Sequence, residues 1–350
     1  MIAHVFLTFL LAQQALDRPP AEVRAGFLAM LDRPKVPLDA ADAPADPPAS
    51  GLVARKVAFT SEVHPDGRPE RVPGLLVKQP EGPERRPAVI VLHGTGGVKE
   101  GERSWLVELA KRGFVAMAID GRAHGERAGG KGGAGAYNRA IVEAWRSKPP
   151  APQVHPLYYD TCWDIWRAID YLQTRPDVDP DRIGLLGTSK GGIETWLAGA
   201  VDERVKVAVP LIATQSFAYV LENNCYQGRA GTVGEAHKAA AADLGKAAVD
   251  AEVCRALWGK VLPGITGPYD CPSMLRLFAG RPLLVVNGRD DPVNPVQGAE
   301  IAVKAARAAF DSAGCPEKFR AIVVPGVGHQ VRPAERAEAL EWLARWLRAS

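Results

Sequence analysis

The chain of 350 residues is long enough for one large domain or two smaller ones. Hydrophobic residues make up 47% and charged residues 24%, which excludes a disordered chain, a collagen-like chain and a protein that spans a membrane many times. Lys and Arg number 43 against 40 Asp and Glu, and the charges are interspersed, so the basic stripe typical of nucleic-acid binding is absent from the sequence. We therefore expect no nucleic-acid partner.

The N-terminal segment favours export. Residues 2–12 are apolar enough for the core of a signal peptide and too short for a membrane span. No Lys or Arg precedes them and the cleavage site that follows is poor, so a packed N-terminal helix in a cytoplasmic protein is the alternative. We expect a signal peptide at 1–16, export to the periplasm or the medium, and no integral membrane segment.

Strand and helix patterns alternate along most of the chain. Residues 17–51 predict a short amphipathic helix, 21–31, and a Pro-rich linker, 34–48. Strands are then expected at 53–59 and 71–78, paired as a hairpin, and at 88–92, 114–119, 183–186, 205–209, 283–286 and 320–324. Helices are expected at 105–112, 159–174, 190–200, 296–310 and 334–347. This alternation predicts an α/β domain over 52–350, with a mostly parallel, doubly wound sheet.

Two segments interrupt the alternation. Residues 129–136 are too rich in glycine for regular structure, so we expect a loop. Residues 214–280 form a long helical insertion between two strands. Insertions of this length inside a compact domain are usually functional, and we interpret this one as a cap or lid.

Ser189 stands in a G-x-S-x-G pattern, Gly187 to Gly191. The pattern follows a predicted strand and opens a predicted helix, which is the setting of a nucleophile elbow. The tight turn strains the serine backbone and leaves no space for flanking side chains, hence the glycines. It also aims the backbone N–H of Lys190 at developing negative charge.

A serine nucleophile needs a histidine base held by a carboxylate, and in an elbow of this kind the chain order is serine, acid, histidine. After Ser189 only His237 and His329 remain. His237 lies in an Ala- and Lys-rich segment and is expected on a helix surface, whereas His329 follows the last strand in a flexible turn. Of two adjacent aspartates after the preceding strand, we choose Asp291, because strand-G-x-x-D-x-x-x-P is the pattern of hydrolases of this type, and leave Asp290 as a turn or surface residue.

The oxyanion hole needs a second backbone N–H, expected in the loop after strand 88–92. That loop contains His93, Thr95 and Gly96. Thr95 is the predicted donor, with Gly96 next, and either would act together with Lys190. We expect His93 to orient the loop by hydrogen bonding, because it precedes the serine and so breaks the triad order.

Five motifs occur in one order: HGTGG at 93–97, DGRAHGER at 120–127, GTSKGG at 187–192, NGRDDP at 287–292 and GVGHQ at 326–330. With them the chain resembles an α/β-hydrolase over about 52–348, closest to the dienelactone-hydrolase, acetyl-xylan-esterase and prolyl-oligopeptidase branch. The resemblance implies an α/β-hydrolase fold with a helical cap insertion. It also implies ester hydrolysis through an acyl-enzyme on the triad Ser189, Asp291 and His329, with no cofactor.

Substrate contacts are less clearly marked. In this branch the turn at 120–125 looks like the D-x-R-G-x-G turn that shapes the pocket floor, and its departure from that pattern makes His124 a candidate contact, with a structural histidine as the alternative. Tyr159 and Trp163 are further candidates, although aromatic residues at helical spacing usually belong to the core. Dienelactone hydrolases carry cysteine where this chain has Ser189, so we expect a small-molecule oxygen ester with a small acyl group, such as an acetylated carbohydrate.

Three other functions stay open. The Ser-Lys-Gly-Gly string resembles the elbow of acyl-CoA thioesterases and acyltransferases, but only about 50 residues precede the first strand, too few for the β-sandwich domain that those thioesterases carry. A prolyl-oligopeptidase-type peptidase would need a large N-terminal domain. A pseudo-hydrolase used as a binding scaffold is disfavoured by the complete set of catalytic roles.

The five cysteines form no Cys-x-x-Cys pair and have no accompanying His-x₃₋₅-His motif, which argues against a structural zinc site. Three of them lie between 225 and 271, where one disulfide bridge could form. Buried free thiols are the alternative. We expect no metal.

Overall fold

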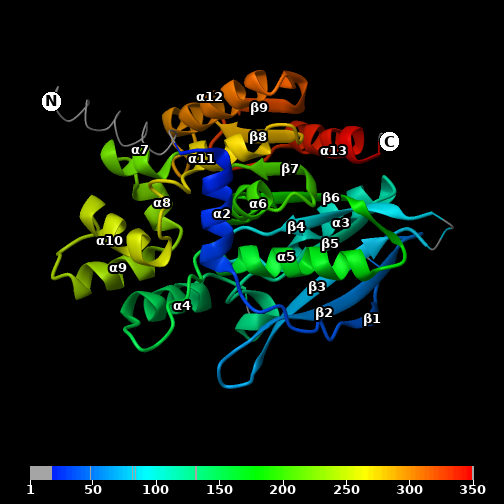
Figure 1. Cartoon of the computed structure of the whole chain (residues 1–350), viewed down its shortest axis with the longest axis horizontal. Helices are drawn as coiled ribbons and strands as arrows, with labels where there is room; N and C mark the ends of the chain where they lie inside the picture. The colour runs from blue at the N-terminus through cyan, green and yellow to red at the C-terminus, as the bar shows by residue number, and fades with distance from the viewer. Residues whose placement is uncertain (1–17, 48, 81, 83, 131, 349–350) are drawn as a thin grey trace.

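The computed structural model describes residues 18–47, 49–80, 82, 84–130 and 132–348, and its arrangement is shown in Figure 1. The predicted signal peptide at 1–16 lies outside the described residues. In the part of the chain that the structure describes, no helix is long and apolar enough to cross a membrane.

Within the described ranges, nine strands form one sheet in the order β1-β2-β3-β5-β4-β6-β7-β8-β9. β1, β2, β3 and β5 pair antiparallel, and β5, β4, β6, β7, β8 and β9 pair parallel. The strands are β1 (Ala41–Ala45), β2 (Val53–Val63), β3 (Pro69–Lys78), β4 (Arg86–Leu92), β5 (Val115–Ile119), β6 (Val178–Thr188), β7 (Val205–Leu211), β8 (Leu283–Gly288) and β9 (Phe319–Val324). The predicted α/β class, the mostly parallel sheet and the β2–β3 hairpin are confirmed.

Helices cover both faces of the sheet (Figure 1). α5, α6 and α12 pack on one face, with α2 outside α5 and α6, and α3 and α13 pack on the other. These helices are α2 (Pro20–Leu31), α3 (Arg103–Lys111), α5 (Tyr159–Thr174), α6 (Lys190–Val201), α12 (Val296–Ser312) and α13 (Pro333–Arg348). Short 3₁₀ turns are η1 (Lys99–Glu102), η2 (Gly125–Ala128), η3 (Arg276–Phe278) and η4 (Pro316–Lys318).

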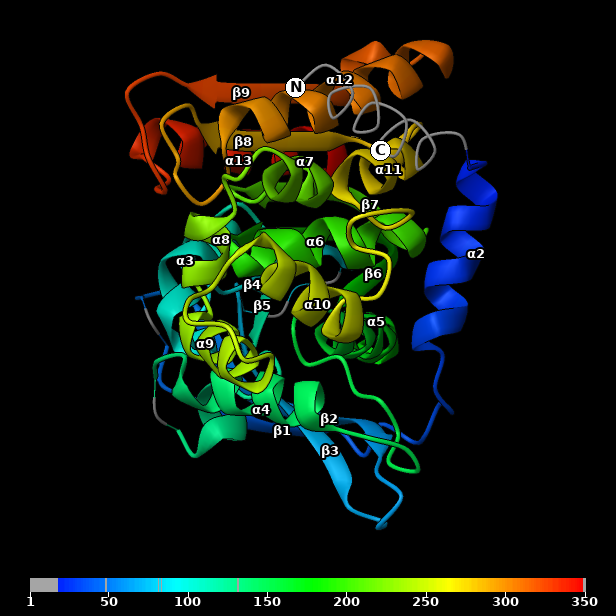
Figure 2. The same cartoon turned by 90° about the vertical axis from the view of Figure 1, so that its left-hand side faces the viewer.

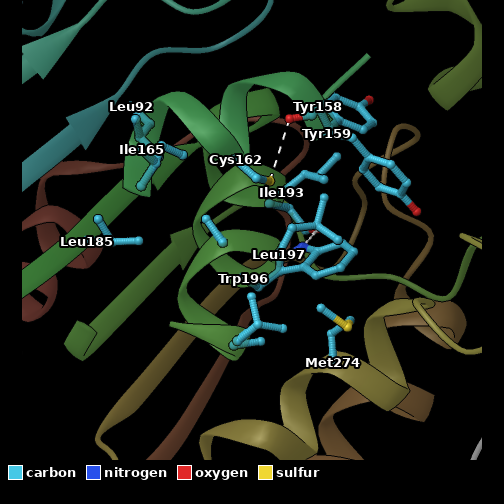
Figure 3. Close-up of a cluster of buried hydrophobic side chains, with 14 of the residues drawn as sticks. Leu92, Tyr158, Tyr159, Cys162, Ile165, Leu185, Ile193, Trp196, Leu197 and Met274 are labelled. Carbon is cyan, nitrogen blue, oxygen red and sulfur yellow. Dashed lines mark hydrogen bonds between the residues drawn. The ribbon is translucent and has the colours of Figure 1, made fainter. Parts of the chain in front are cut away.

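Each face of the sheet buries its own apolar core. The strands alternate side chains between the two faces, so β4 gives Ile90 to one core and Val91 to the other. The larger core lies under α5 and α6, where Trp196 and its neighbours are fully buried (Figure 3). Because helices cover both faces of the sheet, polar groups can gather at the carboxyl ends of its parallel strands.

The segment between β7 and β8 is helical. It contains α7 (Phe217–Glu222), α8 (Gln227–Gly231), α9 (Gly234–Asp243), α10 (Ala251–Val261) and α11 (Cys271–Leu275). α9 and α10 pack against α4 (Gly135–Arg146), and the N–H of Ala236 donates to Oδ1 of Asn138 at 2.9 Å. Figure 2 shows α4, α8, α9 and α10 gathered on one side of the molecule. We call α4 together with α7–α10 the cap.

Two local predictions are corrected. The expected Pro-rich linker contains the strand β1, which pairs with β2 along five residues, and Pro44 is tolerated there because β1 is an edge strand that needs no second neighbour. The glycine-rich segment expected as a loop runs into α4 at Gly135. α4 has no polar cap at its N-terminus, so the usual start signal is absent from the sequence.

Candidate active site

The nucleophile elbow is formed where β6 ends and α6 begins. Ser189 lies between them with φ 55° and ψ −113°, a conformation that is unfavourable for an L-residue and persists only where its surroundings hold it. A Cβ on Gly187 would lie 2.1 Å from the carbonyl oxygen of Gly191, and a Cβ on Gly191 would lie 2.1 Å from that of Leu92. Both positions require glycine, so the G-x-S-x-G pattern has a steric cause.

The structure brings together the three residues of the predicted triad at the edge where the parallel strands end. Oγ of Ser189 lies 2.8 Å from Nε2 of His329, and Nδ1 of His329 lies 2.8 Å from Oδ2 of Asp291. These residues follow β6, β9 and β8. With Nδ1–H donating to the carboxylate, Nε2 carries a free lone pair and can accept the proton of the serine hydroxyl.

The Asp291 carboxylate is buried and accepts several hydrogen bonds. Its side chain is 0% exposed. Oδ1 accepts from the backbone N–H of Val293 at 2.8 Å and of Asn294 at 3.1 Å, and Oδ2 accepts from Nδ2 of Asn294 at 2.9 Å as well as from His329. Burial alone would raise the pKa of Asp291, but the bonds from His329 and Asn294 hold it below its ordinary value. The group is therefore an anion at neutral pH.

The two alternatives to this acid and base have other environments. Asp290 is exposed, and its N–H donates to the carbonyl oxygen of Val327 at 2.9 Å. His237 is 1% exposed, and its Nε2 accepts from Nε1 of Trp258 at 3.0 Å. The expectation that His237 lies on the surface is wrong, because α9 turns this face toward α10 inside the cap.

The predicted oxyanion donors Lys190 and Thr95 flank the nucleophile. Lys190 is the first residue of α6, so its N–H has no acceptor within the helix. Thr95 follows Gly94, where an added Cβ would lie only 3.8 Å from Cβ of Ser189, so the loop after β4 lies against the elbow. The start of α6 and the loop after β4 therefore both lie next to Ser189.

Gly96, the alternative donor, is engaged elsewhere. Its N–H donates to Nε2 of His124 at 3.1 Å, and Nδ1–H of His124 donates to the carbonyl oxygen of Arg122 at 2.7 Å. Burial, followed by the nearby Lys190 ammonium, lowers the pKa of His124, so the ring stays neutral and keeps accepting. His124 therefore fastens the loop, and neither its predicted substrate contact nor the use of Gly96 as an oxyanion donor holds in this structure.

His93 orients the same loop, as expected. Its Nδ1–H donates to the carbonyl oxygen of Gly94 at 2.8 Å, and its Nε2 accepts from the N–H of Gly121 at 3.0 Å. Burial, with the charge of Lys190 next in importance, lowers the pKa of His93 to about 3. The neutral ring ties the loop after β4 to the turn after β5.

Two families of known proteins match the chain. The acetyl xylan esterase (AXE1) family matches residues 34–221, which is more than half of the chain. The chain belongs to the acetyl xylan esterase (AXE1) family. The fungal glucuronyl esterase family also matches, over residues 157–314. The protein is thus a carboxylic-ester hydrolase, and the resemblance stated from its motifs is confirmed.

Individual relatives agree with this assignment. The protein YtaP of Bacillus subtilis (strain 168), named as a hydrolase, is 27% identical over 293 residues, which cover 79% of this chain and 84% of YtaP. An acetyl xylan esterase from Paenibacillus sp. R4 superposes with a TM-score of 0.65 at 19% identity, over 94% of this chain and 100% of that chain. A glucuronoyl esterase from Solibacter usitatus superposes with a TM-score of 0.61 at 18% identity, over 92% of each chain. The structural likeness establishes the α/β-hydrolase fold.

The two aromatic residues predicted as substrate contacts belong to the core of this AXE1 family member. Tyr159 is 0% exposed and lies in the buried cluster of Figure 3. It packs edge-on against Phe27 of α2 with ring centroids 5.1 Å apart, and its hydroxyl donates to the carbonyl oxygen of Pro263. Trp163 is 3% exposed and donates to the carbonyl oxygen of Ser61 at 2.8 Å. Their polar groups already have protein partners, so the predicted contacts do not hold for them.

Sequence reasoning missed a buried ion pair next to the elbow. Nζ of Lys190 lies 2.6 Å from Oε1 of Glu194, and both side chains are 1% exposed. A Cβ on Gly121 would lie 2.7 Å from that Nζ, and the ammonium also lies 5.6 Å from the centre of the Tyr137 ring. The spacing of Lys and Glu by four positions on a predicted helix is the signal that could have found the pair.

The described residues also bear on the predictions for metal sites and disulfide bridges. Across the described ranges, no group of three or more His, Cys, Asp or Glu side chains is placed to hold a metal ion. All five cysteines are free thiols, four of them buried and Cys225 half-buried. The disulfide bridge considered between residues 225 and 271 is not formed. The alternative prediction, buried free thiols, describes four of the five cysteines.

Proposed function

We propose that this carboxylic-ester hydrolase works through Ser189, His329 and Asp291. His329 takes the proton of the Ser189 hydroxyl as its oxygen attacks the ester carbonyl, and returns it to the leaving alcohol. Water, activated by the same histidine, then hydrolyses the acyl-enzyme and frees the acid. The unbroken chain of two 2.8 Å hydrogen bonds from serine to aspartate carries this proposal.

In the same proposal the backbone N–H groups of Lys190 and Thr95 hold the oxyanion. In comparable sites the loss of one such donor lowers kcat by about 10²–10³-fold, so two donors supply a large part of the acceleration. Thr95 is preferred to Gly96, whose N–H is already bonded to His124. Asp291 holds the His329 tautomer and stabilises the imidazolium that forms.

The preferred substrate is an ester of a small acyl group, such as an acetylated carbohydrate. The match to the acetyl xylan esterase family over the elbow and the oxyanion loop supports this choice. A second candidate is an ester whose acyl part is a uronic acid, which the glucuronyl esterase match over 157–314 favours. The two candidates place the sugar on opposite sides of the ester bond.

An ester panel tests the proposal. Initial rates would be measured on p-nitrophenyl acetate, butyrate and octanoate, with acetyl-CoA included for the thioesterase alternative. We expect fast cleavage of the short oxygen esters and none above background by Ser189→Ala, with an unchanged circular dichroism spectrum. Hydrolysis by folded Ser189→Ala at near the wild-type rate would exclude Ser189 as the nucleophile.

The two candidate substrates are separated by natural-type esters. Acetylated xylo-oligosaccharides and the methyl ester of glucuronic acid would be offered at equal concentration, and acid release would be followed by titration. The acetyl proposal requires kcat/KM to be higher for the acetylated oligosaccharide. A higher value for the glucuronate ester would move the assignment to the second candidate and leave the triad proposal intact.

We also propose export, because residues 2–12 have the apolar character of a signal-peptide core. Expression of the full chain followed by fractionation and N-terminal sequencing tests this. A mature N-terminus near residue 17 in the exported fraction would support it, and an intact N-terminus in the cytoplasmic fraction would contradict it.

A further inference from the structure

Arg229 is a buried cation of the cap. It lies in α8 and is 3% exposed. The hydrogen-bond partners of its guanidinium include the neutral side chains of Asn294, Gln215 and Tyr158. A buried charge among neutral partners is costly unless an opposite charge lies close by. We therefore expect contacts that connect Arg229 to an anionic side chain.

Its contacts lead toward the acid of the triad. The guanidinium donates to Oδ1 of Asn294. The Gln215 carboxamide, turned with its oxygen toward Arg229, accepts from Nε at 2.7 Å and donates to the carbonyl oxygen of Val293 at 3.1 Å. Both contacts reach the loop that starts at Asp291, so the arginine holds that loop at two points.

Asn294 transmits the contact to the carboxylate. It is 0% exposed, and its Nδ2 donates to Oδ2 of Asp291 at 2.9 Å and to the carbonyl oxygen of Ile212 at 2.8 Å. A carboxamide has its acceptor at one end and its donors at the other. Because Arg229 can only donate and the two oxygens can only accept, together they fix a single orientation of this amide. The reversed orientation would place two oxygens together at Asp291.

The backbone of α8 is docked at the same place. A Cβ on Gly228 would lie 1.9 Å from the carbonyl oxygen of Pro292, the residue after Asp291. Only glycine allows the helix to come this close. Figure 2 shows α8 on the cap side of the molecule, between α9 and α7.

Tyr158, which interacts with the arginine, has a strained backbone. Tyr158 has φ 65° and ψ −51°, and the N–H of Tyr159 closes a three-residue turn onto the carbonyl oxygen of Leu157 at 2.8 Å. Burial raises the pKa of the Tyr158 phenol, and the adjacent Arg229 opposes that rise. Strain of this kind persists where the surroundings hold a residue in place, and here it sets Tyr158 beside Arg229.

We propose that Arg229 is a positioning residue through which the cap holds the triad: it fixes the Asn294 carboxamide, which in turn aligns the Asp291 carboxylate. The inference rests on the proposed role of Asp291 in the triad. As a consequence, the same contacts that hold the cap against the acid loop also align His329 through Asp291. Removal of Arg229 should therefore lower kcat rather than weaken substrate binding.

A double-mutant cycle on p-nitrophenyl acetate tests this with wild type, Arg229→Met, Asn294→Ala and the double variant. We expect each single variant to lower kcat by about 10–100-fold, the size of effect caused by a displaced catalytic group, with KM changed by less than about threefold. The double variant should lose far less than the product of the two single losses, because the arginine acts largely through the amide. Arg229→Lys should recover part of the loss.

Controls separate this inference from the proposed function. Arg255→Met changes an exposed arginine of the cap helix α10 and should leave kcat unchanged. If Arg229→Met does not fold, Arg229→Lys alone carries the test, with the same requirement that kcat and not KM falls. Losses that multiply in the double variant, a wild-type kcat in Arg229→Met, or an effect on KM alone would overturn the positioning role while Ser189→Ala remains inactive. Activity in Ser189→Ala would instead remove the triad on which the inference rests.

Discussion

At Asp291 a single side chain combines burial with several hydrogen bonds, and its role can be tested alone. Asp291→Asn keeps the shape but replaces the charged acceptor, so His329 loses the partner that fixes its tautomer. We expect kcat to fall by about 10³–10⁴-fold, as for the same change in other serine hydrolases, with little change in KM. Steady-state rates on p-nitrophenyl acetate measure this.

The neighbouring residue provides the control. Asp290 is exposed and adjacent in sequence. Asp290→Asn should keep kcat within about twofold of wild type, because an exposed substitution away from the site has little effect. Equal losses in the two variants would mean that the loop as a whole, rather than the Asp291 carboxylate, supports the reaction.

The meeting of the three candidate triad residues was predictable, because each lies in its own motif. Ser189, Asp291 and His329 each follow a strand in a recognisable string, so their meeting at one edge of the sheet follows from chain order. The pairing of Gly96 with His124 was not predictable, because it joins two loops whose approach depends on the packing of η2 and α4. Asn294 lies in a recognisable string, but its contact with Arg229 joins segments 65 positions apart.

At the scale of elements, the docking of α8 depends on one glycine. Gly228→Ala places a Cβ against the backbone of Pro292, so the helix or the acid loop must move. We expect a loss of about 1–3 kcal/mol in the free energy of unfolding, together with a lower kcat. Urea unfolding and steady-state kinetics measure the two effects.

The same short helix contains a matched control. A Cβ on Gly231 would meet no atom within 4 Å. Gly231→Ala should therefore leave kcat unchanged and keep the free energy of unfolding the same or slightly higher, since alanine restricts the unfolded chain. If both alanine variants behave alike, the close approach at Gly228 has no part in activity.

Elements with strong periodicity or clear boundaries were predictable, and weakly marked ones were not. α5 and α6 carry long apolar faces, and their predicted limits agree with the observed ones to within a residue. α4 has no polar N-cap and follows a run of glycines, so its start gives no signal. β1 has a proline and no apolar alternation, and it exists because β2 offers an unpaired edge.

At the scale of the whole molecule, an ion-pair cluster joins elements that are distant in sequence. Asp164 of α5 is 0% exposed and accepts from Arg122 at 2.8 Å and from Arg127 at 2.7 Å, while Arg127 also pairs with Glu70 of β3. Burial would raise the pKa of Asp164, but the two guanidinium groups hold it well below its usual range. Its contribution to stability is therefore present above the usual carboxylate pKa and is lost as the pH falls through the lowered folded value.

This cluster predicts a pH dependence. Asp164→Asn removes the buried anion that the partly buried Arg122 and Arg127 share and leaves them with Glu70 and Glu62, so we expect a loss of about 3 kcal/mol in the free energy of unfolding at pH 7. Between pH 4 and pH 2 the stability of the variant should fall less steeply than that of wild type, because the titrating group is gone. Urea unfolding at several pH values measures both. If the free energies of unfolding of wild type and Asp164→Asn change with pH in parallel, Asp164 is not the group whose titration lowers the stability.

The N-terminal helix is also part of the molecule's core. Phe27 of α2 is fully buried, with its ring centroid 5.1 Å from that of Tyr159 in α5 and 5.1 Å from that of Tyr269 in the loop before α11. Phe27→Ala should lower the free energy of unfolding by about 3–5 kcal/mol, whereas Leu28→Ala, at an exposed neighbouring position, should lower it far less. Thermal unfolding compares them. A Phe27→Ala variant that melts at the wild-type temperature would show that α2 adds no stability to the hydrolase domain.

The central claim is that Ser189, activated by His329, attacks the ester, and covalent trapping tests it most directly. The protein would be treated with a fluorophosphonate and analysed by intact and peptide mass spectrometry, with His329→Ala in parallel. The account predicts one adduct, located on Ser189, that forms at least about 100-fold more slowly without the histidine base. An adduct on another residue, or unhindered labelling of His329→Ala, would contradict it.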